Sequence, residues 1–269
     1  MYDLKRNTKL SILPFLVLIL FITISISTLA KTEVYFSLSD NPQKAIIQNI
    51  NRAEAFINIA MYTFTDQEIA LSLANAQERG IKIRVYLDRS QIESTYSISR
   101  PLVQKGIKVK ISTNNYIMHN KFAIIDNRLL LTGSYNWTAS ANSRNDENLM
   151  VIDDPEIIAI FQNQFVNLWT NKYSLERTQQ LYQKININFP FLSTTSPKPK
   201  VQTININTAS RDKLINILQI SEPLARKIIV LRDSLSGRFK EPQEILQLPE
   251  LTNLEWQEWK EQGIIITVK

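Results

Sequence analysis

The chain contains one histidine, His119, in the segment MHNKFAIID, with Lys121 two residues later and Asp126 five residues after that. The apolar run from 122 onward predicts a buried strand, so His119 lies just before this strand and Asp126 at the turn that follows it. Ligand-binding groups gather at the ends of strands in α/β sheets. A histidine and a lysine in this position therefore indicate a ligand-binding or catalytic site rather than a structural role.

More polar residues follow in the next segments. Gly133, Ser134 and Asn136 come directly after the apolar run RLLL, and Glu147 precedes the next apolar run. An ammonium with hydroxyl and amide donors suits a phosphoryl centre, because such groups neutralise the charge that develops on non-bridging oxygens. Histidine can attack phosphorus covalently when a carboxylate fixes its tautomer.

Strand-like and helix-like segments alternate over residues 33–173. Strands are expected at 33–38, 55–64, 81–88, 106–112, 121–127, 128–134 and 147–153. Helical patterns cover 42–54, 66–80, 91–105 and 155–169, and Asp66 and Gly80 are placed to cap and to end the second of these. This alternation predicts an α/β fold, a mixed sheet flanked by helices.

Four regions are expected along the chain: an N-terminal segment 1–30, a catalytic domain 31–175, a linker 176–203 and a small domain 204–269. The linker contains FPFLSTTSPKPK, which is rich in proline, serine and threonine. The last region has leucine and isoleucine near helical spacing and is expected to be all-α.

The N-terminal segment has a basic start followed by an apolar run. Lys5, Arg6 and Lys9 precede an uncharged stretch, 10–30, that is about 20 residues long and can span a bilayer. It is expected to be a cleaved signal peptide or an uncleaved anchor, which places the rest of the chain outside the cytoplasm, periplasmic or secreted.

The amino-acid composition excludes some kinds of catalytic and metal site. There is no cysteine among the 269 residues, which excludes a thiol nucleophile and a thiolate-bound metal. The net charge of +6 divides into +2 in 1–30, +1 in 31–175, +3 in 176–203 and zero in 204–269. The excess lies outside the expected domains and is weak support for nucleic-acid binding.

The pattern His119-x-Lys121-x4-Asp126, followed by Gly133-Ser134-x-Asn136, resembles the signature of the phospholipase D superfamily. The segments GSYNWT and ENLMVI are similar to those of its single-motif bacterial nucleases. The resemblance covers about residues 33–173 and implies a phospholipase D-like fold with phosphodiesterase activity.

The resemblance also implies roles for the matching residues. His119 would attack phosphorus, Lys121 and Asn136 would bind the phosphate oxygens, Ser134 would add a hydrogen bond, and Glu147 would hold the imidazole. Asp126 is expected to support the loop rather than to touch substrate, because a carboxylate repels a phosphodiester.

One histidine poses a chemical problem, because the attacking imidazole must be neutral while the leaving oxygen needs an acid. Water or another side chain could be that acid, or two chains could share one site. Single-motif members of the family are homodimers that pair their histidines, so we expect a homodimer. No His, Asp and Glu cluster has metal-ligand spacing, so we expect no cofactor and metal-independent catalysis.

The segments ININTASRDKLINIL and LARKIIVLRDSLSGRFKEPQEILQL are similar to helix-hairpin-helix domains of the competence-protein type. Glycines in such hairpins let the backbone approach DNA phosphates. Here Gln219, Ser221, Glu250 and Thr252 stand where these glycines are expected, and Glu222 and Glu250 would repel phosphate. DNA binding and a packing or dimer-supporting role both stay open for this domain.

Two further sets of residues have a structural and a functional interpretation. Lys108 and Lys110 share one strand face, as do Lys82 and Arg84, and either pair could line a polyanion groove or be solvated. Trp256 and Trp259 are more typical of a helix core than of base stacking.

The function expected first is a nuclease of the phospholipase D type. The alternative is a phospholipase D that cleaves lipid headgroups, for which Tyr116, Ile117 and Met118 could supply part of an apolar rim. A non-catalytic DNA-binding protein is the second alternative, and the complete set of site residues disfavours it.

Overall fold

The structure is a computed structural model that describes residues 30–171, 178–179, 182–183 and 201–269. The predicted signal or anchor segment lies outside these residues except for residue 30, and most of the predicted linker does too. Within the described residues, no helix is long and apolar enough to cross a membrane.

The first part of the chain forms a seven-stranded mixed sheet in the order β1-β7-β6-β5-β2-β3-β4. Strands β2, β3 and β4 are parallel, and the remaining pairs are antiparallel. The strands are β1 (Thr32–Phe36), β2 (Phe56–Met61), β3 (Lys82–Leu87), β4 (Lys108–Ile111), β5 (Lys121–Ile125), β6 (Leu129–Gly133) and β7 (Asn148–Ile152).

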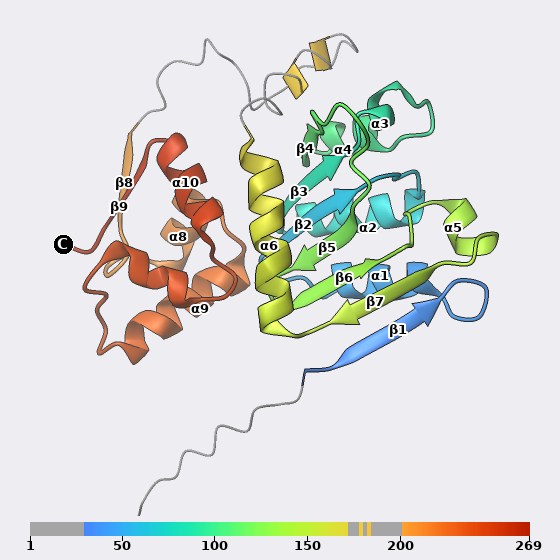
Figure 1. Cartoon of the computed structure of the whole chain (residues 1–269). Helices are drawn as coiled ribbons and strands as arrows, with labels where there is room; N and C mark the ends of the chain where they lie inside the picture. Colours follow the sequence, from blue (N-terminus) through green and yellow to red (C-terminus); the bar gives the residue numbers. More distant parts are fainter. Residues whose placement is uncertain (1–29, 172–177, 180–181, 184–200) are drawn as a thin grey trace, which may run out of the picture.

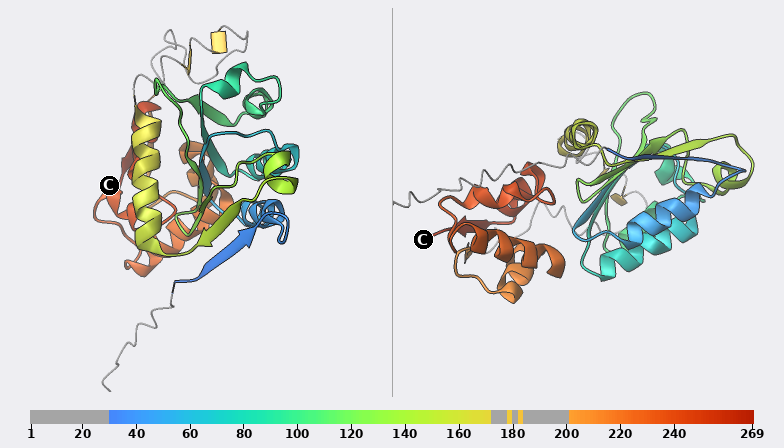
Figure 2. Two further views of the ribbon diagram at one scale, coloured as in Figure 1. Left: turned by 45° about the vertical axis from the view of Figure 1, so that its right-hand side comes forward. Right: turned by 90° about the horizontal axis from the view of Figure 1, so that it is seen from below.

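Helices cover both faces of this sheet. Helices α1 (Pro42–Asn51) and α2 (Gln67–Glu78) lie on one face, and α6 (Pro155–Thr170) lies on the other (Figures 1 and 2). Three short helices, α3 (Ser90–Glu93), α4 (Ser99–Gln104) and α5 (Ala139–Ser143), lie in connections. As predicted, Asp66 caps α2 by accepting from the backbone N–H groups of residues 68 and 69.

Successive side chains of a strand point to opposite faces of the sheet, so the two faces pack into two separate hydrophobic cores. In β2, Ile57, Ile59 and Met61 face α1 and α2, whereas Phe56 and Ala60 face α6. All six residues of β2 are buried because both faces of the central strands are covered.

The last part of the chain forms the expected helical domain with one addition. Helices α8 (Arg211–Leu218), α9 (Glu222–Ser234) and α10 (Asn253–Glu261) and the 3-10 helix η1 (Pro242–Gln247) are joined by a parallel pair of strands, β8 (Gln202–Asn205) and β9 (Ile264–Thr267). Residue 202 of the predicted linker thus already belongs to β8. Trp259 is buried, as expected of a core residue, and its indole N–H donates to the backbone oxygen of Leu218.

The helical domain packs on the α6 side of the sheet, and the two share one apolar cluster (Figure 1). At its centre, Arg84 of β3 is fully buried and donates to Glu255 and Glu258 of α10 at 2.8–3.0 Å and to Asn58 of β2 at 3.1 Å. Neither sequence interpretation of Arg84, a solvated face or a groove for an external polyanion, was therefore right. The carboxylates it binds belong to the same chain.

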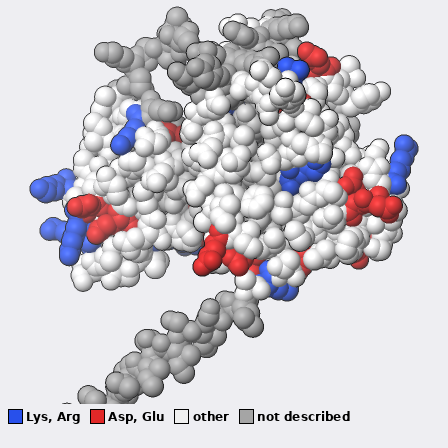
Figure 3. Space-filling model, viewed as in Figure 1, with Lys and Arg blue, Asp and Glu red and all other residues white. Residues whose placement is uncertain are grey.

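The surface charge agrees with the near balance of acidic and basic residues within the two expected domains. On the described part of the face in Figure 3, acidic and basic side chains are interspersed, with no continuous basic stripe.

Candidate active site

Five of the residues predicted to do chemistry lie at one end of the sheet, where the segment before β5, the end of β6 and the start of β7 meet. Lys121 begins β5 opposite Met61, and Gly133 ends β6 opposite Leu149. Ser134 and Asn136 directly follow β6, and Glu147 directly precedes β7. In Figure 1 this is the end near α5, away from the helical domain.

His119 is exposed, and its neighbours fix its backbone. The N–H of Tyr62 donates to the oxygen of Asn120 at 2.9 Å, and the N–H of Met118 donates to the buried carboxylate of Asp88 at 2.8 Å. The imidazole ring meets the Tyr62 ring edge-on, with centroids 4.6 Å apart. The imidazole therefore has one face against an aromatic ring and is open to a substrate.

The Lys121 ammonium lies beside the histidine. Its Nζ donates to the backbone oxygen of His119 at 3.0 Å and lies 5.2 Å from the centre of the Tyr62 ring. Burial lowers the pKa of Lys121, and the nearby charge of Glu147 opposes that shift. A partly desolvated cation next to an imidazole is suited to hold a phosphate oxygen.

The segment after β6 brings amide and hydroxyl groups to the same place. The N–H of Trp137 donates to the oxygen of Thr63 at 3.1 Å, so the chain after β2 lies between the His119 and Asn136 segments. Oδ1 of Asn136 is buried and has no hydrogen-bond partner among the described residues. The Nδ2 group of the same amide is the part that can donate to a phosphate oxygen.

Ser134 and Gly133 complete this segment. The Ser134 hydroxyl accepts from the backbone N–H of Asn148 at 3.1 Å, which leaves its own proton to donate. Gly133 has φ +153°, and a Cβ here would collide with the backbone oxygen of Asn148. The close approach of β6 to β7 therefore requires glycine.

Glu147 is held at the start of β7 by the chain after β1. Its N–H donates to the Ser37 hydroxyl at 2.7 Å, and its Oε1 accepts from Asn145 at 3.0 Å. Its charge acts on Lys121 and also on Tyr135, whose pKa is raised chiefly by burial and further by Asp66 and Glu147. A hydrogen bond from the imidazole to Glu147 stays a prediction.

Asp126 does not join this group. It lies at the other end of β5, is 3% exposed, and accepts from the backbone N–H groups of Glu54, Ala55 and Phe56 at 2.8 Å each. Burial raises its pKa, and the three donors oppose the shift. Its role is to join the end of β5 to the start of β2, the supporting role that its charge suggested.

Tyr62 is the site residue that sequence reasoning missed. It follows β2 directly, and its place at a strand end beside the polar loops was a usable signal. The strand expected over 55–64 included Tyr62, whereas β2 ends at Met61. In the described part of the chain, no three His, Cys, Asp or Glu side chains are grouped so that they could hold a metal ion.

Comparison with known proteins agrees with this arrangement. The family described as "Cardiolipin synthase, PLD-like domain" matches residues 46–169, and the helix-hairpin-helix motif matches 199–261. Phospholipase D of Rickettsia prowazekii (strain Madrid E) is 40% identical over 144 residues, which are 52% of this chain and 70% of that protein. Mitochondrial cardiolipin hydrolase of Chlamydomonas reinhardtii is 38% identical over 120 residues, which are 45% of this chain and 54% of that protein.

Among solved structures, the phospholipase D family member Nuc from Salmonella typhimurium superposes with a TM-score of 0.50 at 27% identity. The match covers 52% of this chain and 94% of Nuc. These matches cover the α/β sheet that carries the imidazole, the lysine and the asparagine at one end. The chain belongs to the phospholipase D superfamily and is a hydrolase of phosphodiesters, rather than the non-catalytic protein considered as an alternative.

The helix-hairpin-helix region faces the catalytic sheet with both of its hairpins. Ser221 of the first hairpin donates to the backbone oxygen of Glu54, and the backbone oxygen of Pro249 in the second accepts from Asn127 at 2.7 Å. Lys227 of α9 bridges Glu54 and Glu250 at 2.6 and 2.7 Å. Glu250, the acid that stands where a hairpin glycine is expected, thus serves an internal ion pair.

Proposed function

We propose that the chain is a nuclease that hydrolyses nucleic-acid phosphodiester bonds without a metal ion, through a phosphohistidine formed on His119. The observation that carries the proposal is an exposed imidazole beside a partly buried ammonium and an unpartnered amide, at one end of a sheet of the phospholipase D type.

Each residue has a defined part in the reaction. A nitrogen of the neutral His119 imidazole forms a bond to phosphorus while the bond from phosphorus to the leaving oxygen breaks. Lys121 and Asn136 hold the non-bridging oxygens, and Ser134 donates a further hydrogen bond, so charge is neutralised where it develops. Water then displaces the imidazole, which releases the phosphomonoester and restores His119.

The leaving oxygen needs a proton from a second group. The chain has one histidine, so we propose that His119 of a second copy supplies the proton across a twofold axis. The exposure of His119 leaves room for this approach.

Exposed aromatic side chains near the site suit a nucleic-acid substrate. Tyr116 is 84% exposed three residues before His119. Tyr96 is 82% exposed in the loop between α3 and α4. The N–H of Ile98 in this loop donates to the backbone oxygen of Phe64, in the segment that follows β2. Bases of a single strand can stack on such rings while the site binds a phosphate of the same strand.

A lipid substrate is the second candidate. Ile117 is 54% exposed next to Tyr116, so the same loop presents an apolar tip that could enter a bilayer surface. The relatives named phospholipase D and cardiolipin hydrolase support this alternative. The chemistry at phosphorus is the same for both substrates.

The decisive experiment uses the chain without its first 30 residues, in excess EDTA, with His119→Ala and Lys44→Met as test and control variants. Cleavage of single-stranded DNA that persists in EDTA, is lost in His119→Ala and is kept in Lys44→Met is expected. Lys44 is exposed on α1, so Lys44→Met shows the effect of losing one surface positive charge away from the site. DNA cleavage abolished by EDTA would refute the metal-independent mechanism.

The lipid alternative has its own test on the same proteins. Release of headgroups from phosphatidyl vesicles, with no cleavage of nucleic acid, would replace nuclease by phospholipase. Tyr116→Ser with Ile117→Ser should then reduce vesicle turnover but leave hydrolysis of bis(p-nitrophenyl) phosphate unchanged, because that soluble diester needs no apolar rim.

We further propose that the enzyme works outside the cytoplasm, exported or anchored by residues 10–30. The basic start and uncharged apolar run support this. Fractionation of cells that express the whole chain tests it, and activity confined to the cytoplasm would refute it.

A further inference from the structure

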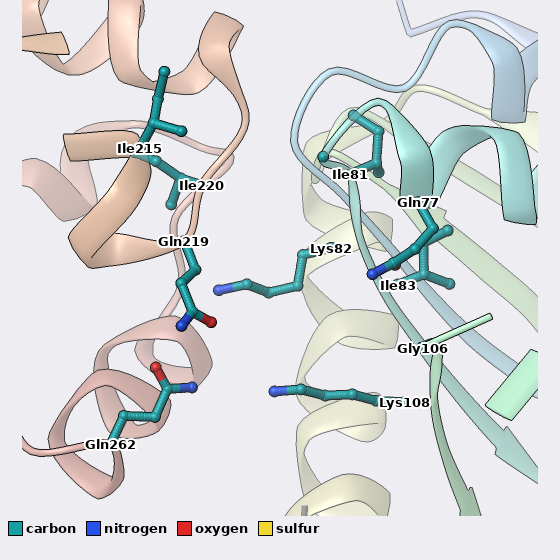
Figure 4. Close-up of a pocket in the computed structure, with 11 residues that line it drawn as sticks. Gln77, Ile81, Lys82, Ile83, Gly106, Lys108, Ile215, Gln219, Ile220 and Gln262 are labelled. Atoms are coloured by element: carbon teal, nitrogen blue, oxygen red, sulfur yellow. The ribbon is translucent and has the colours of Figure 1, made fainter. Parts of the chain in front are cut away.

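A cleft of about 330 Å³ lies between the catalytic sheet and the helical domain, at the start of β3 (Figure 4). β3 runs from Lys82 at the cleft toward Asp88, which holds the His119 loop, so the cleft and the candidate active site lie at opposite ends of the strand. Its polar lining consists of two lysines and three glutamines: Lys82, Lys108, Gln77, Gln219 and Gln262.

The Lys82 ammonium points into this cleft without an acceptor (Figure 4). Its side chain is 16% exposed, and the carboxylate nearest to it, Glu258, is 3.8 Å away, too far for a hydrogen bond. Both oxygens of Glu258 already accept from Arg84, at 3.0 and 2.8 Å. Within the described residues, Lys82 is therefore a nearly buried cation whose three N–H groups make no hydrogen bond.

Two other cations, Arg84 and Lys108, lie near the Lys82 ammonium. Burial and then the charge of Arg84 lower the pKa of Lys82 to about 8, with Lys108 acting in the same sense, while Glu258 and Glu255 oppose the shift. The Lys108 ammonium points into the cleft from the neighbouring strand, and it lies 3.4 Å from Glu258 (Figure 4). A second anion placed between the two lysines would relieve this repulsion.

Amide groups complete the lining. Gln219 and Gln262 reach toward the two lysines from the helical domain (Figure 4). Gln77, from the end of α2, has a buried Oε1 with no hydrogen-bond partner in the described part of the chain. Amide N–H groups donate to an oxyanion, and the Gln77 oxygen can accept from a hydroxyl on the same ligand.

We propose that this cleft binds a phosphate group, with Lys82 as its main cation and with Gln219 and Gln262 holding it from the helical domain. The source is either free phosphate or the terminal phosphate of a nucleotide. A volume of about 330 Å³ is at the small end of ligand pockets and fits a phosphate with little attached to it. Glu258 does not oppose the anion strongly, because three cations, Arg84, Lys82 and Lys108, surround the two carboxylates of Glu255 and Glu258 and leave a net positive charge.

Equilibrium dialysis of the full chain against labelled inorganic phosphate tests the proposal. Lys121→Met serves as the background, because it weakens phosphate binding at the candidate active site, and it should bind one phosphate per chain. Adding Lys82→Met should abolish that binding, and adding Lys44→Met should not. Methionine keeps the length of the side chain and removes a charge that has no hydrogen bond, so the fold is expected to persist.

Gln219→Asn provides a second variant that does not touch the buried cation. Residue 219 has φ +51°, a conformation that asparagine tolerates, and the shorter side chain withdraws the amide. Loss of about one hydrogen bond should weaken phosphate binding roughly 3- to 10-fold. Phosphate binding that is unchanged in both Lys82→Met and Gln219→Asn, or no bound phosphate in the Lys121→Met background, would overturn the proposal.

A competition experiment identifies the source of the phosphate. Displacement of the label by a dinucleotide with a 5′-phosphate, but not by the same dinucleotide without it, assigns the cleft to a nucleotide end. Displacement by unlabelled phosphate alone assigns it to the free ion. Either result supports the phosphate site, whereas displacement by the unphosphorylated dinucleotide would contradict it.

Discussion

Replacing Arg84 by methionine should destabilise the whole chain, because this side chain joins the catalytic sheet to the helical domain. Arg84 is fully buried on β3 and makes three hydrogen bonds to Glu255 and Glu258 and one to Asn58. Methionine fills much of the same volume and has no charge. The variant therefore leaves two carboxylates without their main cation.

The size of the effect follows from the burial of these partners. The side chains of Glu255 and Glu258 are 3% and 10% exposed. Removing one partner of a buried ion pair costs about 3–5 kcal/mol. Lys82 and Lys108 stay near Glu258 and soften the loss, so we expect about 3 kcal/mol, or a fall in Tm of roughly 6–12 °C for a chain of this size.

Urea unfolding followed by tryptophan fluorescence measures the change, with Arg128→Met as the matched control. Arg128 is 54% exposed and lies 3.5 Å from Glu54, so its loss should cost less than about 0.5 kcal/mol. The two variants lose the same charge, and they differ in burial.

A triple variant separates the ion pairs from packing. The triple variant combines Arg84→Met with Glu255→Gln and Glu258→Met, so that no unpaired carboxylate remains. The amide introduced at position 255 would keep the capping bond to Thr252. Most of the stability that Arg84→Met loses should therefore return in the triple variant. An Arg84→Met protein within about 1 kcal/mol of the original, or a triple variant as unstable as the single one, would refute this reasoning.

The remaining predictions concern the pH dependence of stability, Asp126 at the end of β5, and two residues at the candidate active site. Folding lowers the pKa of Lys82 from 10.5 to about 8, so the unfolded chain binds more protons than the folded chain between these pH values. The contribution of Lys82 to the unfolding free energy should therefore rise with pH in this window. Urea titrations at several pH values measure this rise, which should vanish in Lys82→Met. Asp126→Ala should lose about 3 kcal/mol in the same assay, from three backbone donors left without an acceptor, while the folded protein keeps its kcat; a large loss of kcat would restore Asp126 to the site. Tyr62→Ala should lower kcat about 2- to 10-fold with little change in KM, because the ring contact that orients His119 is worth about 0.5–1.5 kcal/mol; an unchanged kcat would remove Tyr62 from the site. Gly133→Ala should yield an inactive or unfolded protein, since β6 and β7 cannot both keep their places; circular dichroism and activity that match the original would contradict this.

The sequence predicted every strand of the main sheet and its principal helices, because local signals were strong there. Asp66 and Gly80 bounded α2 as expected, and Gly80 has φ +87°. The helix expected over 91–105 is divided into α3 and α4, because at residues 94–98 serine hydroxyls bond to nearby backbone N–H groups instead of continuing the helix. The pairing of β8 with β9 joins segments about 60 residues apart, which local patterns do not reveal.

The site was predicted as far as a motif can place it. His119, Lys121, Ser134, Asn136 and Glu147 lie at one end of the sheet, and Asp126 lies at the other end of β5, as its place after the apolar run indicated. Motif spacing does not reveal the backbone donors that Asp126 binds, because they belong to a segment about 70 residues earlier in the chain. The partners of Arg84 and Lys82 lie in another domain, so a periodicity along β3 could show only that both side chains share a face.

The ion pairs of Arg84 also bear on the time course of synthesis. Glu255 and Glu258 follow Arg84 by 171 and 174 residues, which the ribosome adds in roughly 10–35 s. During that interval the strands of the sheet can exist, yet the α6-side surface around Arg84 has neither its carboxylates nor its apolar cover. Until α10 emerges, the nascent catalytic domain therefore exposes an apolar surface of the kind that chaperones bind.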